Sequence, residues 1–216
     1  MKPTEVAVFK LFKRAVALKE LPRTGAIIEG VTRSEADTIA AHSWAVSLLS
    51  VVVATHLSKQ FPGIDIGRVA IMAILHDLTE CITGDLPSGL KRFAPEAVDM
   101  LEPRVSEFLL EGLLGKDDLT EVLNEYEART TAAAKIVKFA DIVDAWAHLQ
   151  LRLKREFPSY LEHADKLLRM GSSEDLGVGS HLADWLQACR EEWPTIQPSP
   201  LSKATNSMQP KAQIEV

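Results

Sequence analysis

The sequence predicts an all-α fold in a single domain, and three observations support this prediction. Apolar side chains recur close to every 3.6 residues through most of the chain, which is the period of an α-helix. Turns rich in proline and glycine, such as Pro62-Gly63, separate the periodic segments. No run of alternating β-branched residues is longer than four, so no β-sheet is expected.

Start and stop signals delimit the expected helices. The first is followed by the helix-breaking segment Leu21-Pro22-Arg23-Thr24-Gly25 and by a loop that runs to about residue 34. Asp65 is the expected N-cap of the third helix. A tight loop is expected over residues 83–89. In order along the chain, helices are predicted over residues 5–18, 36–61, 66–81, 95–114, 119–128, 130–155, 160–170 and 180–192.

The folded domain is expected to cover residues 1–194. From Thr195 onward the composition changes, because prolines stand among Ser, Thr, Lys, Asn and Gln and few apolar side chains remain to form a core. The tail over residues 195–216 is therefore predicted to be disordered and to take no part in the chemistry.

Composition and charge narrow the possible functions. The 216 residues are 46% hydrophobic and 25% charged, as in ordinary soluble globular proteins. A net charge of −6 gives no basic surface for nucleic acid, so no such partner is expected. The longest apolar run, near residues 47–54, is shorter than the ~20 residues that span a bilayer, so no membrane partner is expected. Cys81 and Cys189 form no C-x-x-C pair, and with no signal peptide a cytoplasmic location is expected.

The most informative feature is His76-Asp77, with His42 upstream and Asp141 well downstream. Two imidazoles and two carboxylates form a mixed nitrogen and oxygen site that suits a divalent transition metal, and such a site can activate water for hydrolysis. Asp144, one turn after Asp141, is an alternative ligand that periodicity does not exclude. For His76-Asp77 taken alone, a capping aspartate and a hydrogen-bonded core histidine are the competing interpretation. The other four histidines show no ligand spacing and are His56, His148, His163 and His181.

Further polar residues lie near these candidates in the sequence. Glu80 follows His76 by four residues, so the predicted helix places both on one face, where a carboxylate can orient or deprotonate water. Asp85 follows a glycine in the next loop and is either a turn residue or a second carboxylate facing the site. Arg23 and Lys91 can neutralise an anion, and a guanidinium can grip a phosphate with two hydrogen bonds. The competing interpretation of each, taken singly, is a solvated surface charge.

The ordered set of two histidines and two aspartates resembles the HD-domain metal phosphohydrolases. Six short segments are similar to the 5′-deoxynucleotidase branch of that family and occur in its order. They are Leu21-Pro22-Arg23-Thr24-Gly25, Ala41-His42-Ser43, His76-Asp77-Leu78-Thr79-Glu80, Thr83-Gly84-Asp85-Leu86-Pro87, Glu125-Tyr126-Glu127 and the segment from Lys135 to Asp141. The resemblance spans roughly residues 5 to 190.

This resemblance implies a helical bundle around one divalent metal held by His42, His76, Asp77 and Asp141. It assigns water activation and leaving-group handling to residues that match Glu80 and Asp85. It also places the arginine that matches Arg23 on the 5′-phosphate and implies a homodimer. Thr24 stands where some members carry a tryptophan next to the sugar, so the preference between deoxyribose and ribose is not predicted.

The expected function is metal-dependent hydrolysis of (deoxy)nucleoside 5′-monophosphates to nucleoside and phosphate. The small nucleotide is the expected partner, and Mn, Co, Fe, Ni and Zn all remain candidates for the metal. One alternative is a phosphohydrolase that acts on another nucleotide, such as a dNTP, a cyclic nucleotide or a signalling nucleotide. The other alternative is a non-catalytic helical binding protein that keeps a metal for stability.

Overall fold

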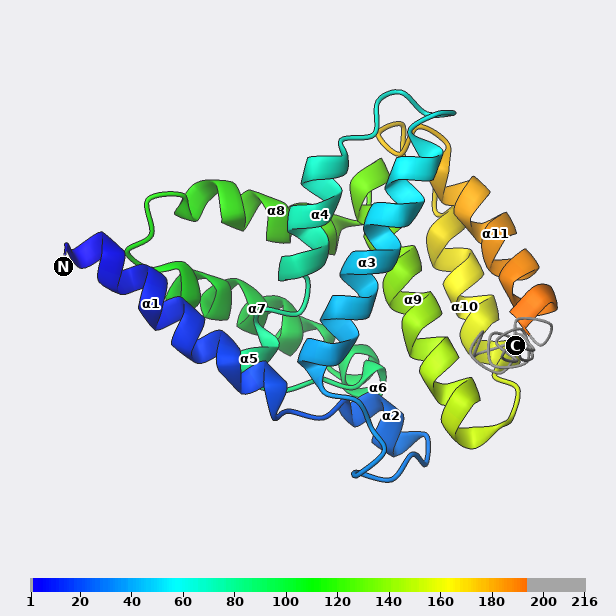
Figure 1. The fold of residues 1–216 in the computed structure, drawn as a ribbon, viewed down its shortest axis with the longest axis horizontal. Helices are drawn as coiled ribbons and strands as arrows, with labels where there is room; N and C mark the ends of the chain where they lie inside the picture. Colours follow the sequence, from blue (N-terminus) through cyan, green and yellow to red (C-terminus); the bar gives the residue numbers. More distant parts are fainter. Residues whose placement is uncertain (1, 194–216) are drawn as a thin grey trace, which may run out of the picture.

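The computed structural model describes residues 2–193, and within them the chain is helical without a strand (Figure 1). The predicted all-α fold is confirmed. The predicted tail over residues 195–216 lies outside the described residues. In order, the elements are α1 (Pro3–Ala15), the 3-10 helix η1 (Val16–Lys19), α2 (Thr24–Ile28), α3 (Ile39–Leu57), α4 (Ile66–Leu75), α5 (Glu80–Thr83), α6 (Ser88–Phe93), α7 (Pro95–Leu110), α8 (Lys116–Ala128), α9 (Ala132–Leu153), α10 (Pro158–Arg169) and α11 (Val178–Glu192).

Helix α9 is the centre of the bundle. It packs against α3 and α4 on one side and α10 and α11 on the other, and it also contacts α8 (Figure 1). Ile136, Ala140 and Trp146 are among its fully or almost fully buried side chains. Because α9 is apolar on most of its circumference, it is stable only with neighbours on several sides.

A buried lysine joins α9 to the end of α10. Lys135 is 2% exposed, and its Nζ donates hydrogen bonds to the carbonyl oxygens of Leu167 and Met170 at 2.9 and 2.8 Å. These carbonyls belong to the last turn of α10 and the residue after it, where backbone oxygens lack helical partners. The ammonium group therefore caps α10 and fixes it against the central helix.

Three helices begin with side-chain caps that match the sequence. The Thr38 hydroxyl accepts from the Ala41 backbone N–H at the start of α3, and Thr131 accepts from Ala134 at the start of α9. Asp65 accepts from the N–H of Arg68 at 3.0 Å, so its predicted role as the N-cap of α4 is confirmed.

The helix predicted over residues 66–81 is wrong, because α4 ends at Leu75. The chain then makes a tight turn whose backbone N–H groups bond three residues back, as in Leu78 to Leu75 and Glu80 to Asp77, before α5 begins. The apolar pattern continues through Leu78 and Cys81, which face a second apolar cluster with Val105 and Leu109 of α7. Periodicity therefore cannot reveal the break, which separates His76-Asp77 from both helices.

A short helix, α2, lies in a segment predicted as a loop, and another, α6, begins within the loop predicted over residues 83–89. The backbone N–H of Arg23 donates to the Asp37 carbonyl oxygen at 2.9 Å, beside an isolated bridge between Pro22 and Thr38. The Gly25 N–H donates to Asp85 Oδ2 at 2.9 Å. Helix α2 is thus fixed by contacts distant in sequence, which local patterns do not report.

Helix α3 passes a length and composition test for a membrane span, although no membrane contact follows from it, because the core helices of soluble proteins pass the same test. Its inner face, including Val46, Val53 and Leu57, is buried in the bundle. Its opposite face exposes Trp44 and Leu48. The expectation that this chain has no membrane partner remains a prediction.

Candidate functional site

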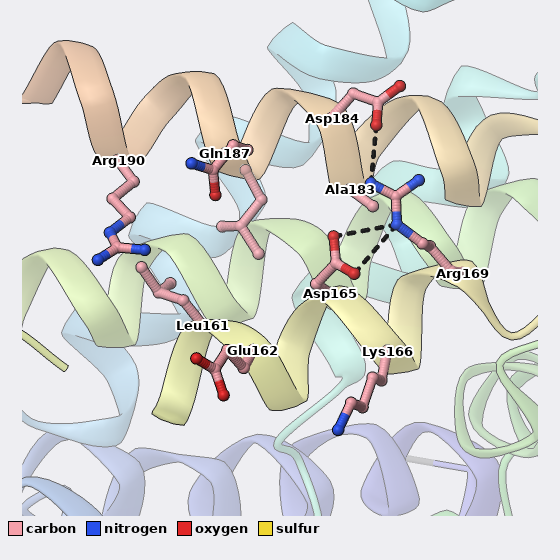
Figure 2. Close-up of a pocket in the computed structure, with 10 residues that line it drawn as sticks. Leu161, Glu162, Asp165, Lys166, Arg169, Ala183, Asp184, Gln187 and Arg190 are labelled. Atoms are coloured by element: carbon pink, nitrogen blue, oxygen red, sulfur yellow. Dashed lines mark hydrogen bonds and ion pairs between the residues drawn. The ribbon is translucent and has the colours of Figure 1, made fainter. Parts of the chain in front are cut away.

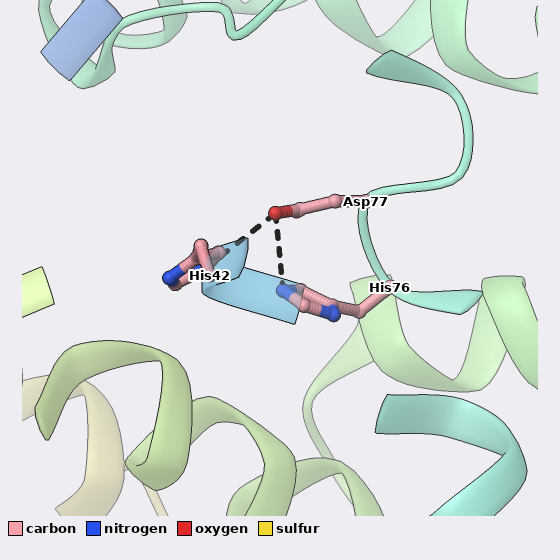
Figure 3. A group of neighbouring side chains, drawn as sticks. All are labelled: His42, His76 and Asp77. Carbon is pink, nitrogen blue, oxygen red and sulfur yellow. Dashed lines mark ion pairs between the residues drawn. The ribbon is translucent and has the colours of Figure 1, made fainter. Parts of the chain in front are cut away.

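His42, His76 and Asp77 form a compact group in which one potential ligand atom of each residue lies within 4.8 Å of the others (Figure 3). His42 comes from the first turns of α3, whereas His76 and Asp77 follow the last turn of α4. Asp77 Oδ2 lies 3.5 Å from His42 Nε2 and 3.2 Å from His76 Nε2. The turn that breaks the predicted helix therefore aims the His-Asp pair at the distant histidine.

Both imidazoles are oriented by hydrogen bonds from their other nitrogen. His76 Nδ1 donates to the carbonyl oxygen of Ala73 at 2.8 Å, and His42 Nδ1 donates to Asp144 Oδ2 at 2.6 Å. The Nε2 lone pairs then point into the group. Both Nε2 atoms are buried and have no hydrogen-bond partner, which is costly for a polar atom. A divalent cation removes that cost, so these residues fit a metal.

The choice between Asp141 and Asp144 follows from the nitrogen that each carboxylate meets. Asp141 Oδ1 lies 3.2 Å from His42 Nε2, on the side of the ring that faces Asp77. Asp144 meets Nδ1, on the opposite edge of the ring. Asp141 therefore faces the group of His42, His76 and Asp77, whereas Asp144 has the position of a carboxylate that orients a metal-binding histidine.

Asp141 is also held by two residues that the sequence analysis did not single out as site residues. Its Oδ2 accepts from Lys138 Nζ at 2.6 Å and from the Tyr126 hydroxyl at 3.3 Å. The Tyr126 ring also lies edge-on to His76, with 5.6 Å between ring centroids. Both residues belong to the short segments that carried the family resemblance, and those segments were the only sequence signal for them.

The protonation of His42 is set by competing effects. Burial and the positive charge of Arg23 both oppose a proton on this ring. The carboxylates of Asp141 and Asp144 against the ring, with the nearby charge of Asp77, outweigh them and raise its pKa to about 9. The carboxylates around His42 thus favour a positive charge at this position, which is the electrostatic environment that a bound metal requires.

Arg23 lies beside the cluster, as the sequence predicted for an anion-binding group. Its Nη1 is 3.4 Å from Asp77 Oδ2, and its Nε is 3.8 Å from Asp85 Oδ2. Burial alone would raise the pKa of Asp77, but the two imidazoles and this guanidinium hold it below its usual range. Arg23 is the residue before α2, so the contacts that fix α2 also position the guanidinium.

Glu80 lies in the same cavity, although the predicted helical face shared with His76 does not exist. It is the first residue of α5, is 8% exposed, and its Oε2 is buried without a hydrogen-bond partner. Burial, followed by the charges of Asp77 and Asp85, raises the pKa of this carboxyl to about 9. Glu80 can therefore hold a proton at neutral pH.

The remaining predicted residues lie at different places. Asp85 contacts the backbone of Gly25 as well as Arg23, so both interpretations, a turn residue and a carboxylate near the site, have support. Lys91 lines the cavity and lies 3.6 Å from Glu102. Thr24 is not among the residues that line the cavity, although its neighbours Arg23 and Gly25 are.

The cavity has a volume of about 530 Å³, enough for a small ligand, and extends beyond the cluster. One wall is apolar and comes from α9 and α10. Asp37, His148 and Tyr160 also line the cavity, and no sequence pattern pointed to them. The residues of this wall include Ile142, Ala145, Leu149, Phe157, Tyr160 and Ala164.

A second cavity, of about 560 Å³, lies between α10 and α11 (Figure 2). The Arg169 guanidinium spans it and bonds to Asp165 at 3.0 Å and to Asp184 at 2.7 Å (Figure 2). These partners satisfy each other, and this cavity contains no group of candidate metal ligands. The functional site is therefore assigned to the cavity that contains His42 and His76.

Comparison with known proteins agrees with this geometry. The HD domain family model matches residues 15–168. The 5′-deoxynucleotidase PM0747 of Pasteurella multocida is 28% identical over 151 residues, which cover 66% of this chain and 77% of that protein. A dATP triphosphohydrolase of Salmonella phage PMBT28 is 35% identical over 91 residues, 39% of this chain and 46% of the phage protein.

Among solved structures, PH0347 from Pyrococcus horikoshii OT3 matches with a TM-score of 0.63 and 26% identity, over 81% of this chain and 99% of the other. The resemblance found in the sequence to the HD-domain family and its 5′-deoxynucleotidase branch is thus confirmed. The match of one model to more than two thirds of the chain identifies this protein as a member of the HD-domain family.

Proposed function

We propose that the protein hydrolyses (deoxy)nucleoside 5′-monophosphates to nucleoside and phosphate, with one divalent metal bound at His42, His76, Asp77 and Asp141. The observation that carries this proposal is the pair of buried, unpartnered Nε2 atoms beside ionised carboxylates, inside a cavity that also holds Arg23. A purely structural metal site gains nothing from an open cavity beside it. Relatives named 5′-deoxynucleotidase support the substrate class.

The metal supplies Lewis-acid polarisation of the phosphate and lowers the pKa of water, as divalent cations do in hydrolases. His42 and His76 bind as neutral imidazoles through Nε2, and Asp77 and Asp141 bind as carboxylates. Tyr126 and Lys138 keep Asp141 in place through their hydrogen bonds. Mn, Co, Fe, Ni and Zn all accept such a donor set.

Arg23 binds the 5′-phosphate in this proposal. In the structure its guanidinium contacts Asp77 and Asp85 without a close bidentate pair, since the distances are 3.4 and 3.8 Å. A phosphate that enters the cavity offers better geometry and more negative charge. Lys91 also lines the cavity, and its positive charge helps to neutralise the charge of the transition state.

Glu80 is the proposed proton carrier. Its buried, unpartnered Oε2 lines the cavity, and its raised pKa allows it to exchange a proton near neutral pH. Because it holds a proton at neutral pH, it gives that proton to the 5′-oxygen that leaves. Asp85 supports this exchange electrostatically and also holds the backbone next to Arg23.

A phosphate-release screen tests the proposed function. The purified protein is supplied with each candidate metal and incubated with ribo- and deoxyribonucleoside 5′-monophosphates. We expect metal-dependent release of phosphate, which the Asp77→Ala variant loses while its far-ultraviolet circular dichroism is unchanged. Full activity of Asp77→Ala, or no release from any monophosphate with any metal, would refute the proposal.

A second candidate is hydrolysis of a nucleoside triphosphate. Lys91, Arg92 and Arg129 also line the cavity, together with Glu102 and Glu127, and one relative is named a dATP triphosphohydrolase. The acidic neighbours already offset much of this charge, so we favour the monophosphate. Incubation of the same protein with nucleoside triphosphates tests this candidate, and release of pyrophosphate or triphosphate would favour it. If neither monophosphates nor triphosphates react, another phosphoester becomes the substrate class to test.

The proposed active form is a homodimer in which the two protomers contact each other through the outer face of α3 and α4. This α3–α4 face comprises Trp44, Leu48, Val52, Ile71 and Ile74, each between 47% and 68% exposed. The ring contact of His42 with His76 places the start of α3 beside the end of α4. Helices α3 and α4 pack side by side (Figure 1), so their exposed apolar side chains are neighbours on the surface.

Area and charge favour a second copy of this chain as the occupant of the α3–α4 face. Its five side chains expose roughly 600 Å² of apolar surface, most of the ~800 Å² that each partner contributes to a standard stable interface. Helix α3 contains no Asp, Glu, Lys or Arg, and Arg68 of α4 is already paired with Glu121 and Glu125. Two such faces can meet without burying an unpaired charge.

A further inference from the structure

A polar pair on the cavity wall, Asp37 and His148, has no role in the proposed hydrolysis. His148 Nε2 lies 3.6 Å from Asp37 Oδ1, which is too long for a hydrogen bond, and this nitrogen is buried without a partner. The His148 side chain is only 13% exposed and the Asp37 side chain only 21%. Because an unpaired buried nitrogen costs free energy, a ligand group that pairs with it binds favourably.

The separation between the proposed metal ligand on α9 and this pair follows from the geometry of the helix. Asp141 and His148 are seven residues apart, so they lie on one side of the helix, about 10 Å apart along its axis. Ala145 lies between them and lines the cavity with a side chain that ends at Cβ. Space is therefore left along α9 between the catalytic end of the cavity and His148.

Asp37 lies between His148 and the proposed metal site. One of its carboxylate oxygens, one nitrogen of His42 and one oxygen of Asp144 lie within 4.8 Å of one another. The Asp37–His148 pair thus extends from the edge of the metal site toward the apolar part of the cavity. A nucleoside bound through its 5′-phosphate places its sugar in this intermediate position.

The chemistry of the pair selects the ligand group. A carboxylate only accepts hydrogen bonds, whereas the buried His148 Nε2 can donate one, and a hydroxyl does both at once. A phosphate would be repelled by Asp37. The neighbouring wall, with Ile142, Leu149 and Tyr160, suits the flat apolar face of a base rather than its polar edge.

We propose that Asp37 and His148 bind a sugar hydroxyl of the nucleotide, which donates to the Asp37 carboxylate and accepts from His148 Nε2–H. This inference rests on the proposed nucleotide substrate and adds the group by which the sugar is recognised. The nucleotide then has three anchor points, at the metal with Arg23, at this pair and at the apolar wall. A substrate without the bound hydroxyl leaves the carboxylate and the imidazole unpaired.

The test compares four 5′-monophosphates of one base, in the ribo, 2′-deoxy, 3′-deoxy and 2′,3′-dideoxy forms. In the unaltered protein, loss of the bound hydroxyl should lower kcat/KM by at least about tenfold. The His148→Ala variant should bring that ratio close to one, because it loses more kcat/KM on the forms that carry the bound hydroxyl than on the dideoxy form. His148→Gln retains a donor and should restore part of the discrimination.

His163→Ala is the matched control, because His163 is another histidine that lines the cavity, on α10, and it is not part of the pair. It should keep the full discrimination among the four sugars. Equal hydrolysis of all four by the unaltered protein, or an equal loss on all four in His148→Ala, would overturn the assignment. No phosphate release from any of the four would refute the proposed hydrolysis itself.

Discussion

His42 and Asp144 are joined by a hydrogen bond of 2.6 Å between Nδ1 and Oδ2, across 102 residues of sequence. This bond holds the imidazole so that Nε2 faces Asp77 and Asp141. Asp144→Asn should therefore weaken metal binding by about 10- to 100-fold, as the loss of such supporting carboxylates does elsewhere. Isothermal titration calorimetry of the metal-free variant with Mn²⁺ measures this effect.

A matched control separates this effect from a general loss of negative charge. Asp99 on α7 is exposed and outside the cavity, so Asp99→Asn should leave the affinity unchanged. Thermal unfolding without metal should be similar for both variants. An Asp144→Asn protein that binds Mn²⁺ as tightly as the unaltered protein would show that the short bond does not support the ligand.

The pKa of Glu80 predicts how the stability of the metal-free protein depends on pH. The folded state raises this pKa from the ordinary 4.5 to about 9, so it binds the proton more tightly than the unfolded state does. The contribution is fully present below about pH 4.5 and is lost as the pH rises toward 9. His42, raised from 6.5 to about 9, acts in the same direction over the upper half of that range.

Glu80→Gln removes the first of these contributions, because the amide stays neutral at every pH. In EDTA, the melting temperature of the unaltered protein should fall between pH 5.5 and pH 8.5, and the fall should be smaller in Glu80→Gln. Differential scanning fluorimetry at both pH values measures the two slopes. Identical slopes in the two proteins would contradict a buried, protonated Glu80.

Arg23 should act through the geometry of its guanidinium as well as through its charge. Arg23→Lys keeps the charge but loses the planar fork that bonds two phosphate oxygens. We expect kcat/KM for a nucleoside monophosphate to fall by about tenfold or more at saturating metal. Steady-state phosphate release measures this, with the exposed Arg33 as the control position. Arg33→Lys should be unchanged, and an equally active Arg23→Lys would exclude bidentate binding.

The sequence predicts a helix well when the residues that determine its ends are close to it in the sequence. The central helix was predicted over residues 130–155 and is observed as α9 (Ala132–Leu153), because its cap and its long apolar pattern are local. The break after Leu75 was missed because Leu78 and Cys81 preserve the apolar pattern on both sides of it. Helix α2 was missed because its supports, Thr38 and Asp85, are distant in sequence.

In the candidate site, too, some residues could be predicted from the sequence and others only from the folded structure. His42, His76, Asp77 and Asp141 were found from residue type and order, and the structure brings them together. Asp144 could be named as a candidate but not placed, since only the folded ring of His42 distinguishes the two aspartates. His148 gave no signal, because its significance depends on its distance from Asp37 and on the cavity between them.

The proposed dimer predicts a specific loss of association. Leu48→Glu introduces a charge in the middle of the α3–α4 face, where a second copy would have to desolvate it. Light scattering after size-exclusion chromatography should give a mass near twice 23.8 kDa for the unaltered protein and near 23.8 kDa for this variant. Circular dichroism should be the same for both, because Leu48 faces away from the core.

Leu151→Glu is the control for Leu48→Glu, because Leu151 on α9 is 63% exposed and lies outside this face. It should leave the dimer intact, since a charge there meets only water. An unaltered protein that is monomeric at 50 µM, or a Leu48→Glu variant that stays dimeric, would contradict the proposed interface. Monomeric protein that binds phosphatidylcholine vesicles through Trp44, with a blue-shifted tryptophan fluorescence that Leu48→Glu abolishes, would instead assign the α3–α4 face to a lipid surface.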